Sequence, residues 1–78
     1  MQHELKIEEP YYHSILEGKK TFEIRYNDRG YQAGDSVIMK VQFRALPGII
    51  ADIGYVTGFN QEDNFVVFSL LNIKKEYD

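Results

Sequence analysis

The stretch PYYHSILEGKKTFEIRY, residues 10–26, contains the change of pattern that decides the fold. Proline is tolerated in the first turn of a helix, and Pro10 is followed by apolar residues at helical spacing. Glycine readily adopts the left-handed conformation that ends a helix, so Gly18 marks its end. From Lys20 onward polar and apolar residues alternate with the period of a strand. We therefore predict a helix over about 9–17 and a strand directly after it.

The alternation after Lys20 assigns the side chains of this strand to two faces. Successive side chains of a strand point to opposite sides of the sheet, and the apolar side usually packs on the core. The face that we predict to enter the core consists of Phe22, Ile24 and Tyr26. The face that we predict to point outward consists of Thr21, Glu23 and Arg25.

Further strand-like runs lie on both sides of this stretch. Before it, residues 3–7 alternate, and we predict that His3, Leu5 and Ile7 face inward. After the turn at Ala33-Gly34-Asp35, the residues predicted to share one strand face are Val37, Met39, Val41 and Phe43.

The second half of the chain contains two more runs, separated from the rest by Pro47-Gly48 and by the polar loop 60–64. The run over 49–56 contains Gly54, which with Gly58 predicts a bend or a bulge. The run over 65–73 is apolar on both faces, as a central strand would be.

The predicted order is β-α-β-β-β-β, with eleven aromatic residues among 78. A flat sheet of this size would leave two unprotected edges, so a strongly bent sheet or a closed barrel plugged by the helix is favoured. We predict a single domain over residues 1–78 with an α+β fold, a small mixed β-barrel of about five strands and one N-terminal helix.

Composition narrows the possible functions. The absence of cysteine excludes disulfides, thiolate metal ligands and cysteine nucleophiles, and two histidines cannot complete a zinc site without carboxylates. We therefore expect no metal and no cofactor. No apolar run approaches about 18 residues, and the N-terminal residues are too charged for a signal peptide. We expect a soluble cytoplasmic protein, a monomer, with no membrane segment.

The charge distribution is uneven. The net charge is −3, yet residues 19–29 hold four basic and two acidic residues. A positive site on an acidic body suits a small anionic ligand or a few nucleotides better than a long duplex. A solvated strand and turn is the alternative.

Three ionisable residues of this window can face one space, namely Lys20, Glu23 and Arg25. Glu23 and Arg25 are two residues apart on a strand, so they can pair. They form either an ordinary surface ion pair or a clamp, in which Glu23 holds a guanidinium that binds phosphate or a carbonyl edge. Lys20 would add a point charge beside it, with Asn27 and Arg29 at the rim.

The pattern Gly18-x-Lys20-x-x-Glu23-x-Arg25 resembles the signature of the ASCH domain family, named for activating signal cointegrator homology, a branch of the PUA-like superfamily. The resemblance extends over nearly the whole chain, which is similar to the small single-domain bacterial and phage members of the family. Further matching segments are His3-Glu4-Leu5-Lys6-Ile7, Arg25-Tyr26-Asn27-Asp28-Arg29, Gln32-x-Gly34-Asp35 and Gly54-Tyr55-Val56.

This resemblance implies a PUA-like β-barrel with a cleft beside the helix, and a role in binding RNA or modified nucleosides. Some small ASCH proteins are amidohydrolases that remove acyl groups from N4-acylated cytidines, and their catalytic Lys matches Lys20. Their neighbouring Thr falls at the position of Glu23, which could act as a base on water but not as a hydroxyl nucleophile. Glu62 and Asp63 are the candidates for their later catalytic Glu.

The remaining polar and aromatic residues have structural interpretations beside functional ones. We expect His3 to be a satisfied core or rim histidine and His13 to be solvated. Four tyrosines flank the basic window, where aromatic rings beside cations suit base stacking, although packing in the core or rim is the alternative for each. They are Tyr11, Tyr12, Tyr26 and Tyr31.

The leading prediction is a domain that binds single-stranded RNA or a nucleotide through Lys20, Glu23, Arg25, Asn27 and Arg29. An amidohydrolase acting on a modified nucleoside, with Lys20 and Glu23 as catalytic residues, is the alternative. An accessory domain that binds another protein is the third possibility.

Overall fold

The computed structural model describes residues 1–77 and has one short helix and five strands in the predicted order. The elements are β1 (Gln2–Lys6), α1 (Glu9–Leu16), β2 (Phe22–Tyr26), β3 (Ser36–Lys40), β4 (Ile49–Thr57) and β5 (Phe65–Lys75). Pro10 lies in the first turn of α1, and Gly18 after its end has φ +77°, as the sequence predicts. Among the described residues, no helix has the length and apolar character needed to cross a membrane.

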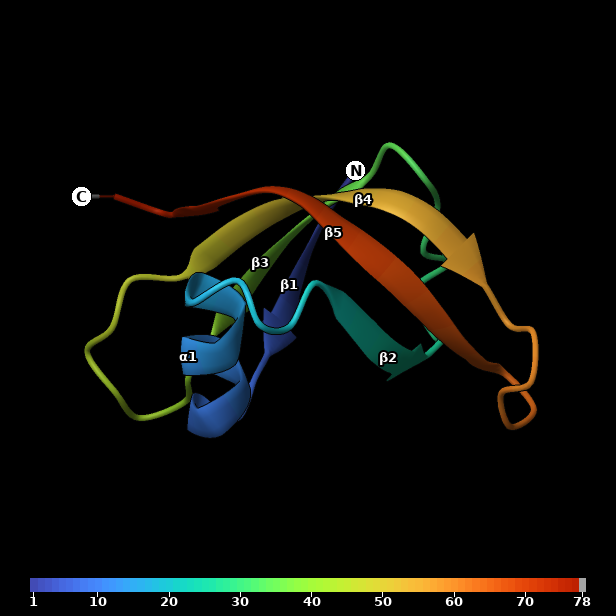
Figure 1. Cartoon of the computed structure of the whole chain (residues 1–78), viewed down its shortest axis with the longest axis horizontal. Coiled ribbons are helices and arrows are strands. Elements are labelled where there is room, and N and C mark those ends of the chain that lie inside the picture. The colour runs from blue at the N-terminus through green and yellow to red at the C-terminus, as the bar shows by residue number, and fades with distance from the viewer. Residues whose placement is uncertain (78) are drawn as a thin grey trace.

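The five strands form one mixed sheet in the order β1-β3-β4-β5-β2. Only β1 and β3 are parallel, and every other neighbouring pair is antiparallel. The sheet curls into a half-barrel, with β4 and β5 arching over the molecule and α1 beside β1 (Figure 1). The predicted α+β barrel-like fold is therefore confirmed. The curl places the two edge strands, β1 and β2, opposite one another.

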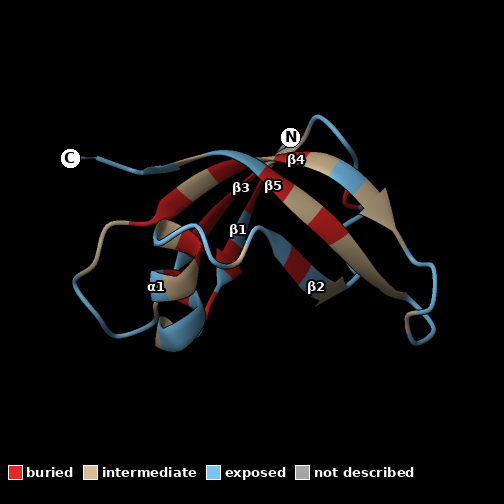
Figure 2. Ribbon diagram, viewed as in Figure 1, coloured by how far each residue is buried: buried red, intermediate tan, exposed pale blue. Residues whose placement is uncertain are grey.

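The core lies inside the curl and contains residues from all these elements except β2. Helix α1 contributes Tyr12 and Ile15, which lie on the side turned toward the sheet. His3, Leu5 and Ile7 are all buried, which confirms the predicted inner face of β1. Buried residues concentrate on β1, β3 and the first half of β4 (Figure 2).

Strand β4 bends where glycine predicted it. The ladder between β4 and β5 shifts register twice, and the second shift lies between Ile53 and Val56. A Cβ atom on Gly54 would lie 2.8 Å from both Leu71 Cδ1 and Ser69 Oγ, so only glycine fits this close approach without rearrangement. The bulge gives the sheet part of its curl.

Strand β3 is shorter than predicted. It ends at Lys40, and Phe43 is 95% exposed with φ +65° in the turn that follows. Val41 is only half-buried, so the predicted apolar face of this strand holds for Val37 and Met39 alone. The prediction for Phe43 is wrong because the chain leaves the sheet before reaching it.

The alternation along β2 is correctly predicted, but the inward and outward faces are the reverse of the prediction. Its exposed side carries Phe22, Ile24 and Tyr26, whereas Glu23 is only 3% exposed. Glu23 lies opposite Phe68 in the ladder with β5, and residues directly opposite in a ladder share a face. Because Phe68 points into the core, Glu23 must point inward too. Figure 2 shows this as a single buried band on β2.

Candidate functional site

A cleft runs between the two edge strands of the half-barrel. Arg25 on β2 crosses it, and its Nη2 donates a hydrogen bond of 2.9 Å to the carbonyl oxygen of Lys6 on β1. A side chain thus bridges the gap that backbone pairing leaves open. Arg25 and Lys6 separate two cavities, because both residues line each of them.

The first cavity, of about 480 Å³, lies between β2 and the N-terminal end of α1. Its size falls in the usual range for small-ligand sites, about 300 to 1,000 Å³. Its lining residues are Lys6, Ile7, Glu8, Tyr11, Lys20, Phe22, Glu23, Ile24 and Arg25.

Glu23 forms the wall of this cavity together with two cations. Its Oε1 accepts a hydrogen bond from Lys20 Nζ, and its Oε2 accepts one of 2.8 Å from Arg25 Nε. The Lys20 and Arg25 side chains are only 18% and 24% exposed. The sequence-predicted group Lys20, Glu23 and Arg25 is therefore brought together, facing the inside of the half-barrel.

The turn after α1 places Lys20 at the mouth of the cavity. The backbone N–H groups of Lys19 and Lys20 both donate to the carbonyl oxygen of Ser14, which closes the end of the helix tightly. The Lys20 ammonium then lies 4.5 Å from the centre of the Tyr11 ring and 5.7 Å from that of Phe22. Both distances allow cation–π attraction.

The second cavity, of about 830 Å³, lies on the other side of Arg25. Arg29, Tyr31 and Lys40 are among its lining residues. The Arg29 guanidinium is only loosely paired, with its Nε 4.0 Å from Asp28 Oδ1. Arg29 thus lines the second cavity, on the opposite side of Arg25 from Lys20.

Asn27 has a different place from the one predicted. Its Oδ1 accepts a hydrogen bond of 3.0 Å from the backbone N–H of Tyr31, which stabilises the turn between them. Asn27 lines neither cavity. Its hydrogen bond holds the turn that carries Arg29 and Tyr31.

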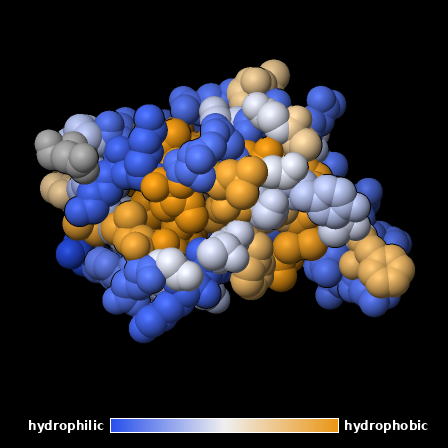
Figure 3. Space-filling view, turned by 45° about the horizontal axis from the view of Figure 1, so that its top comes forward, coloured by the Kyte–Doolittle hydropathy of each residue, from blue (hydrophilic) through white to orange (hydrophobic). Residues whose placement is uncertain are grey.

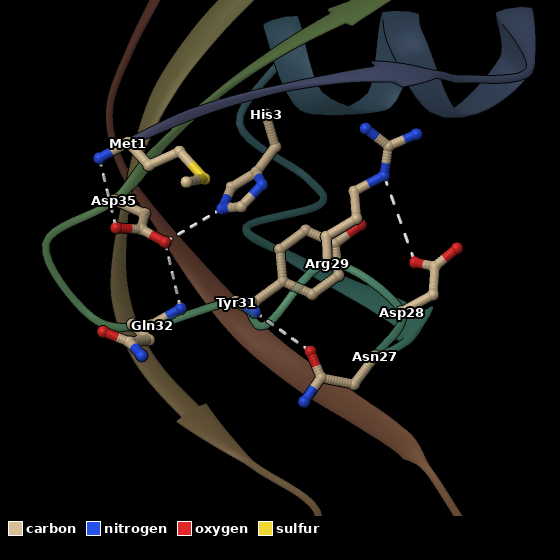
Figure 4. A network of polar contacts seen from close by, with 8 residues as sticks. All are labelled: Met1, His3, Asn27, Asp28, Arg29, Tyr31, Gln32 and Asp35. Carbon is tan, nitrogen blue, oxygen red and sulfur yellow. Dashed lines mark hydrogen bonds and ion pairs between the residues drawn. The ribbon is translucent and has the colours of Figure 1, made fainter.

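A polar network anchors the turn formed by residues 32–35 to β1 (Figure 4). His3 Nε2 lies 2.9 Å from Asp35 Oδ2, and a carboxylate only accepts, which assigns the proton to this nitrogen. The hydrogen bond from His3 holds the pKa of Asp35 below its ordinary value, against the effect of desolvation. The His3 and Tyr31 rings pack edge to face at 4.9 Å. His3 is thus a satisfied core histidine.

Other sequence candidates lie outside the cleft. Glu62 and Asp63 are exposed in the loop between β4 and β5 and line neither cavity. His13 is exposed and its Nε2 lies 3.1 Å from Glu9 Oε2. Within residues 1–77, no group of three or more His, Asp or Glu side chains is arranged to hold a metal ion.

Several residues of the cleft are not predicted from the sequence. The alternating pattern assigns Phe22 to the core, although its position two residues after Lys20 allows contact with the ammonium. The carbonyl of Lys6 and the side chain of Lys40 enter the cleft only through the parallel pairing of β1 with β3. No local signal predicts that pairing.

Two similarities to known proteins accompany this geometry. A family model described as "Domain of unknown function (DUF3850)" matches residues 2–70. An "Uncharacterized 12.9 kDa protein in GpA 3'region" of Escherichia phage P2 is 46% identical over 37 residues, which are 47% of this chain and 34% of that protein. The chain therefore aligns with about a third of the length of this relative.

Proposed function

The chain belongs to the DUF3850 family, whose description assigns no function, and we propose from the cleft itself that it binds single-stranded RNA or a nucleotide. The observation that carries the proposal is the cavity wall formed by Lys20, Glu23 and Arg25, with the exposed rings of Tyr11 and Phe22 at its mouth. The resemblance of the sequence to the ASCH family supports the same ligand class.

The chemistry of the wall selects ligands that accept hydrogen bonds. Both oxygens of Glu23 accept a hydrogen bond, one from Lys20 and the other from Arg25, so this carboxylate positions the two cations. The ammonium and the guanidinium keep further N–H donors after these contacts. Phosphate oxygens and the acceptor edges of bases suit such donors.

The aromatic side chains supply a second kind of contact. The rings of Tyr11 and Phe22 are about half exposed and flank the Lys20 ammonium. Stacking of a base on an aromatic ring contributes about 1 to 3 kcal/mol per base and tolerates different sequences. Figure 3 shows apolar side chains gathered across the middle of one face of the molecule, surrounded by hydrophilic ones. Bases of a single strand are free to stack on the Tyr11 and Phe22 rings, whereas bases paired in a duplex are not.

Titration of a fluorescently labelled single-stranded RNA tests the proposal. We expect binding at low salt, and we expect Arg25→Ala and Tyr11→Ala each to weaken it about fivefold or more. Tyr11 is half exposed, so its replacement should leave the fold intact. Arg44→Ala is the matched control, because Arg44 is exposed, pairs with Glu9 and lines neither cavity. Absence of binding by the wild-type protein at low salt would refute the proposal.

A second candidate function is hydrolysis of an N4-acylated cytidine, favoured by the direct contact of Lys20 with Glu23 in the cavity wall. In this reaction Lys20, acting as base, takes a proton from a water molecule that Glu23 orients. The water oxygen bonds to the acyl carbon, the bond from that carbon to N4 breaks, and N4 takes the proton from Lys20. Incubation with N4-acetylcytidine should then yield cytidine and acetate, and Lys20→Met should abolish the reaction.

An accessory domain that binds another protein is the function that remains if neither assay responds. We propose that the protein binds the nucleic-acid ligand in the cytoplasm and as a monomer. Size-exclusion chromatography with light scattering checks the second statement, and a mass near 9.1 kDa is expected.

A further inference from the structure

The second cavity has properties that the proposed base-binding site does not use. Its wall carries four cations, Lys6, Arg25, Arg29 and Lys40, against the two acids Glu4 and Asp28. Arg25 is paired with Glu23 at 2.8 Å, whereas Lys40 and Arg29 are only loosely paired, with Glu4 at 3.4 Å and with Asp28 at 4.0 Å. A cavity of this kind attracts an anion.

Tyr31 provides an independent sign of a ligand. The residue is 5% exposed and lines this cavity, and among residues 1–77 its hydroxyl has no hydrogen-bond partner. Burial raises the pKa of this hydroxyl, so it remains a protonated donor at neutral pH. Arg25 and Arg29 are the cations that act most strongly on it. A hydroxyl donor that opens into the cavity, has no partner among the described residues and lies beside two guanidinium groups is suited to an oxygen of an anionic ligand.

We propose that the second cavity binds the phosphate of a nucleotide whose base occupies the first cavity. Arg25 lies at the boundary and lines both cavities, so it can contact both parts of one ligand. This inference rests on the proposed function and names its ligand class. The ligand is a nucleoside monophosphate or the equivalent step of an RNA chain, and a nucleoside without phosphate leaves the second cavity empty.

Calorimetric titration with the four ribonucleosides and their 5′-monophosphates tests the inference. We expect the preferred monophosphate to bind at least about tenfold more tightly than its nucleoside. Tyr31→Phe keeps the buried ring and should weaken monophosphate binding about threefold to fivefold, and Arg29→Gln should weaken it about tenfold. Neither substitution should change the affinity for the nucleoside.

Two matched substitutions outside the cavities serve as controls. Tyr55→Phe removes a hydroxyl from an exposed tyrosine of β4, and Arg44→Gln removes an exposed guanidinium. Both should leave monophosphate binding unchanged. Unfolding curves of Tyr31→Phe and Arg29→Gln, compared with the wild type, separate a loss of fold from a loss of ligand contact.

The outcomes distinguish this inference from the proposed function. Equal affinity for nucleoside and monophosphate, or no effect of Tyr31→Phe and Arg29→Gln, would overturn the phosphate subsite while base binding stands. Binding of RNA without any binding of the nucleosides or their monophosphates would overturn the phosphate subsite as well. If RNA, nucleosides and monophosphates all fail to bind, both the subsite and the proposed function are lost.

Discussion

Glu23 shows how a charged residue can occupy the interior of a small protein. A buried carboxylate without partners is strongly destabilising, and Glu23 is held by Lys20 on one oxygen and by Arg25 on the other. Both cations remain partly exposed, so each keeps some hydration. The three side chains thus bring their charges into the cleft at a moderate cost in the stability of the fold.

Removing this charge should destabilise the fold. Glu23→Gln leaves two cations facing each other across a buried amide, and we expect the free energy of unfolding to fall by about 2 to 3 kcal/mol in urea denaturation. Glu17→Gln is the control, because Glu17 pairs with Lys19 at the surface and should change stability by less than about 0.5 kcal/mol. Equal stability of the two variants would contradict the burial of Glu23.

The hydrogen bonds of Asp35 predict that the stability of the fold decreases at low pH. Its pKa is held below the ordinary value of 3.8, chiefly by the hydrogen bond from His3, so the folded state favours the ionised carboxylate. A depressed pKa stabilises the protein above pH 3.8, and this stabilisation is lost as the pH falls through the folded-state value. Urea unfolding from pH 7 downward should show the wild type approaching Asp35→Asn in stability below pH 3.8. A constant difference between them down to about pH 2 would contradict this prediction.

At the scale of elements, β2 is the strand whose neighbours override its sequence pattern. It is an edge strand that pairs only with β5, and β5 offers apolar side chains on both faces. Either phase of β2 would therefore find apolar neighbours. The observed phase leaves Phe22, Ile24 and Tyr26 half exposed and directs Glu23 and Arg25 into the cleft. Exceptions of this kind to sequence rules tend to occur at functional sites.

Alanine substitutions on two strands test the phase of β2. Ile24 is 50% exposed and Ile53 on β4 is 2% exposed. We expect Ile24→Ala to lower the free energy of unfolding by less than about 1 kcal/mol and Ile53→Ala to lower it by about 2 to 5 kcal/mol. A loss at Ile24 as large as that at Ile53 would mean that Ile24 enters the core.

At the scale of the whole molecule, the cleft contains five of the nine basic residues of an acidic protein. The net charge of the chain is −3, whereas the cleft walls contain four acidic residues against five basic ones, Lys6, Lys20, Arg25, Arg29 and Lys40. These residues come from β1, β2, the turns that flank it and β3, and the curl of the sheet brings them together. A short nucleic acid can enter this field, whereas the acidic remainder of the surface repels a longer one.

The salt dependence of RNA binding should therefore be shallow. If about three phosphates are neutralised, the logarithm of the affinity should fall with the logarithm of salt concentration at a slope of about −2 for a single strand. Fluorescence titrations between about 50 and 300 mM salt measure this slope. Arg29→Gln should reduce it by about one phosphate contact, and Arg44→Gln should not. A slope steeper than about −5 would indicate contacts outside the cleft.

Much of this architecture follows from the sequence alone, because its determinants are local. The helix end at Gly18, the order of the elements, the inner face of β1 and the bend at Gly54 depend on turn chemistry and on short-range periodicity. Lys20, Glu23 and Arg25 could be grouped from spacing for the same reason, since they lie within one turn and the strand after it.

Tertiary structure decided what local pattern leaves open. The phase of β2 depends on its register with Phe68, more than forty residues away in sequence. The parallel pairing of β1 with β3 brings the Lys6 carbonyl to Arg25 and Lys40 into the cleft. Both are long-range pairings, whose free energy depends on packing across the whole sheet and not on the residues beside them in the chain. The sequence thus predicts which residues carry charge, and the curl of the sheet determines that they face the same cleft.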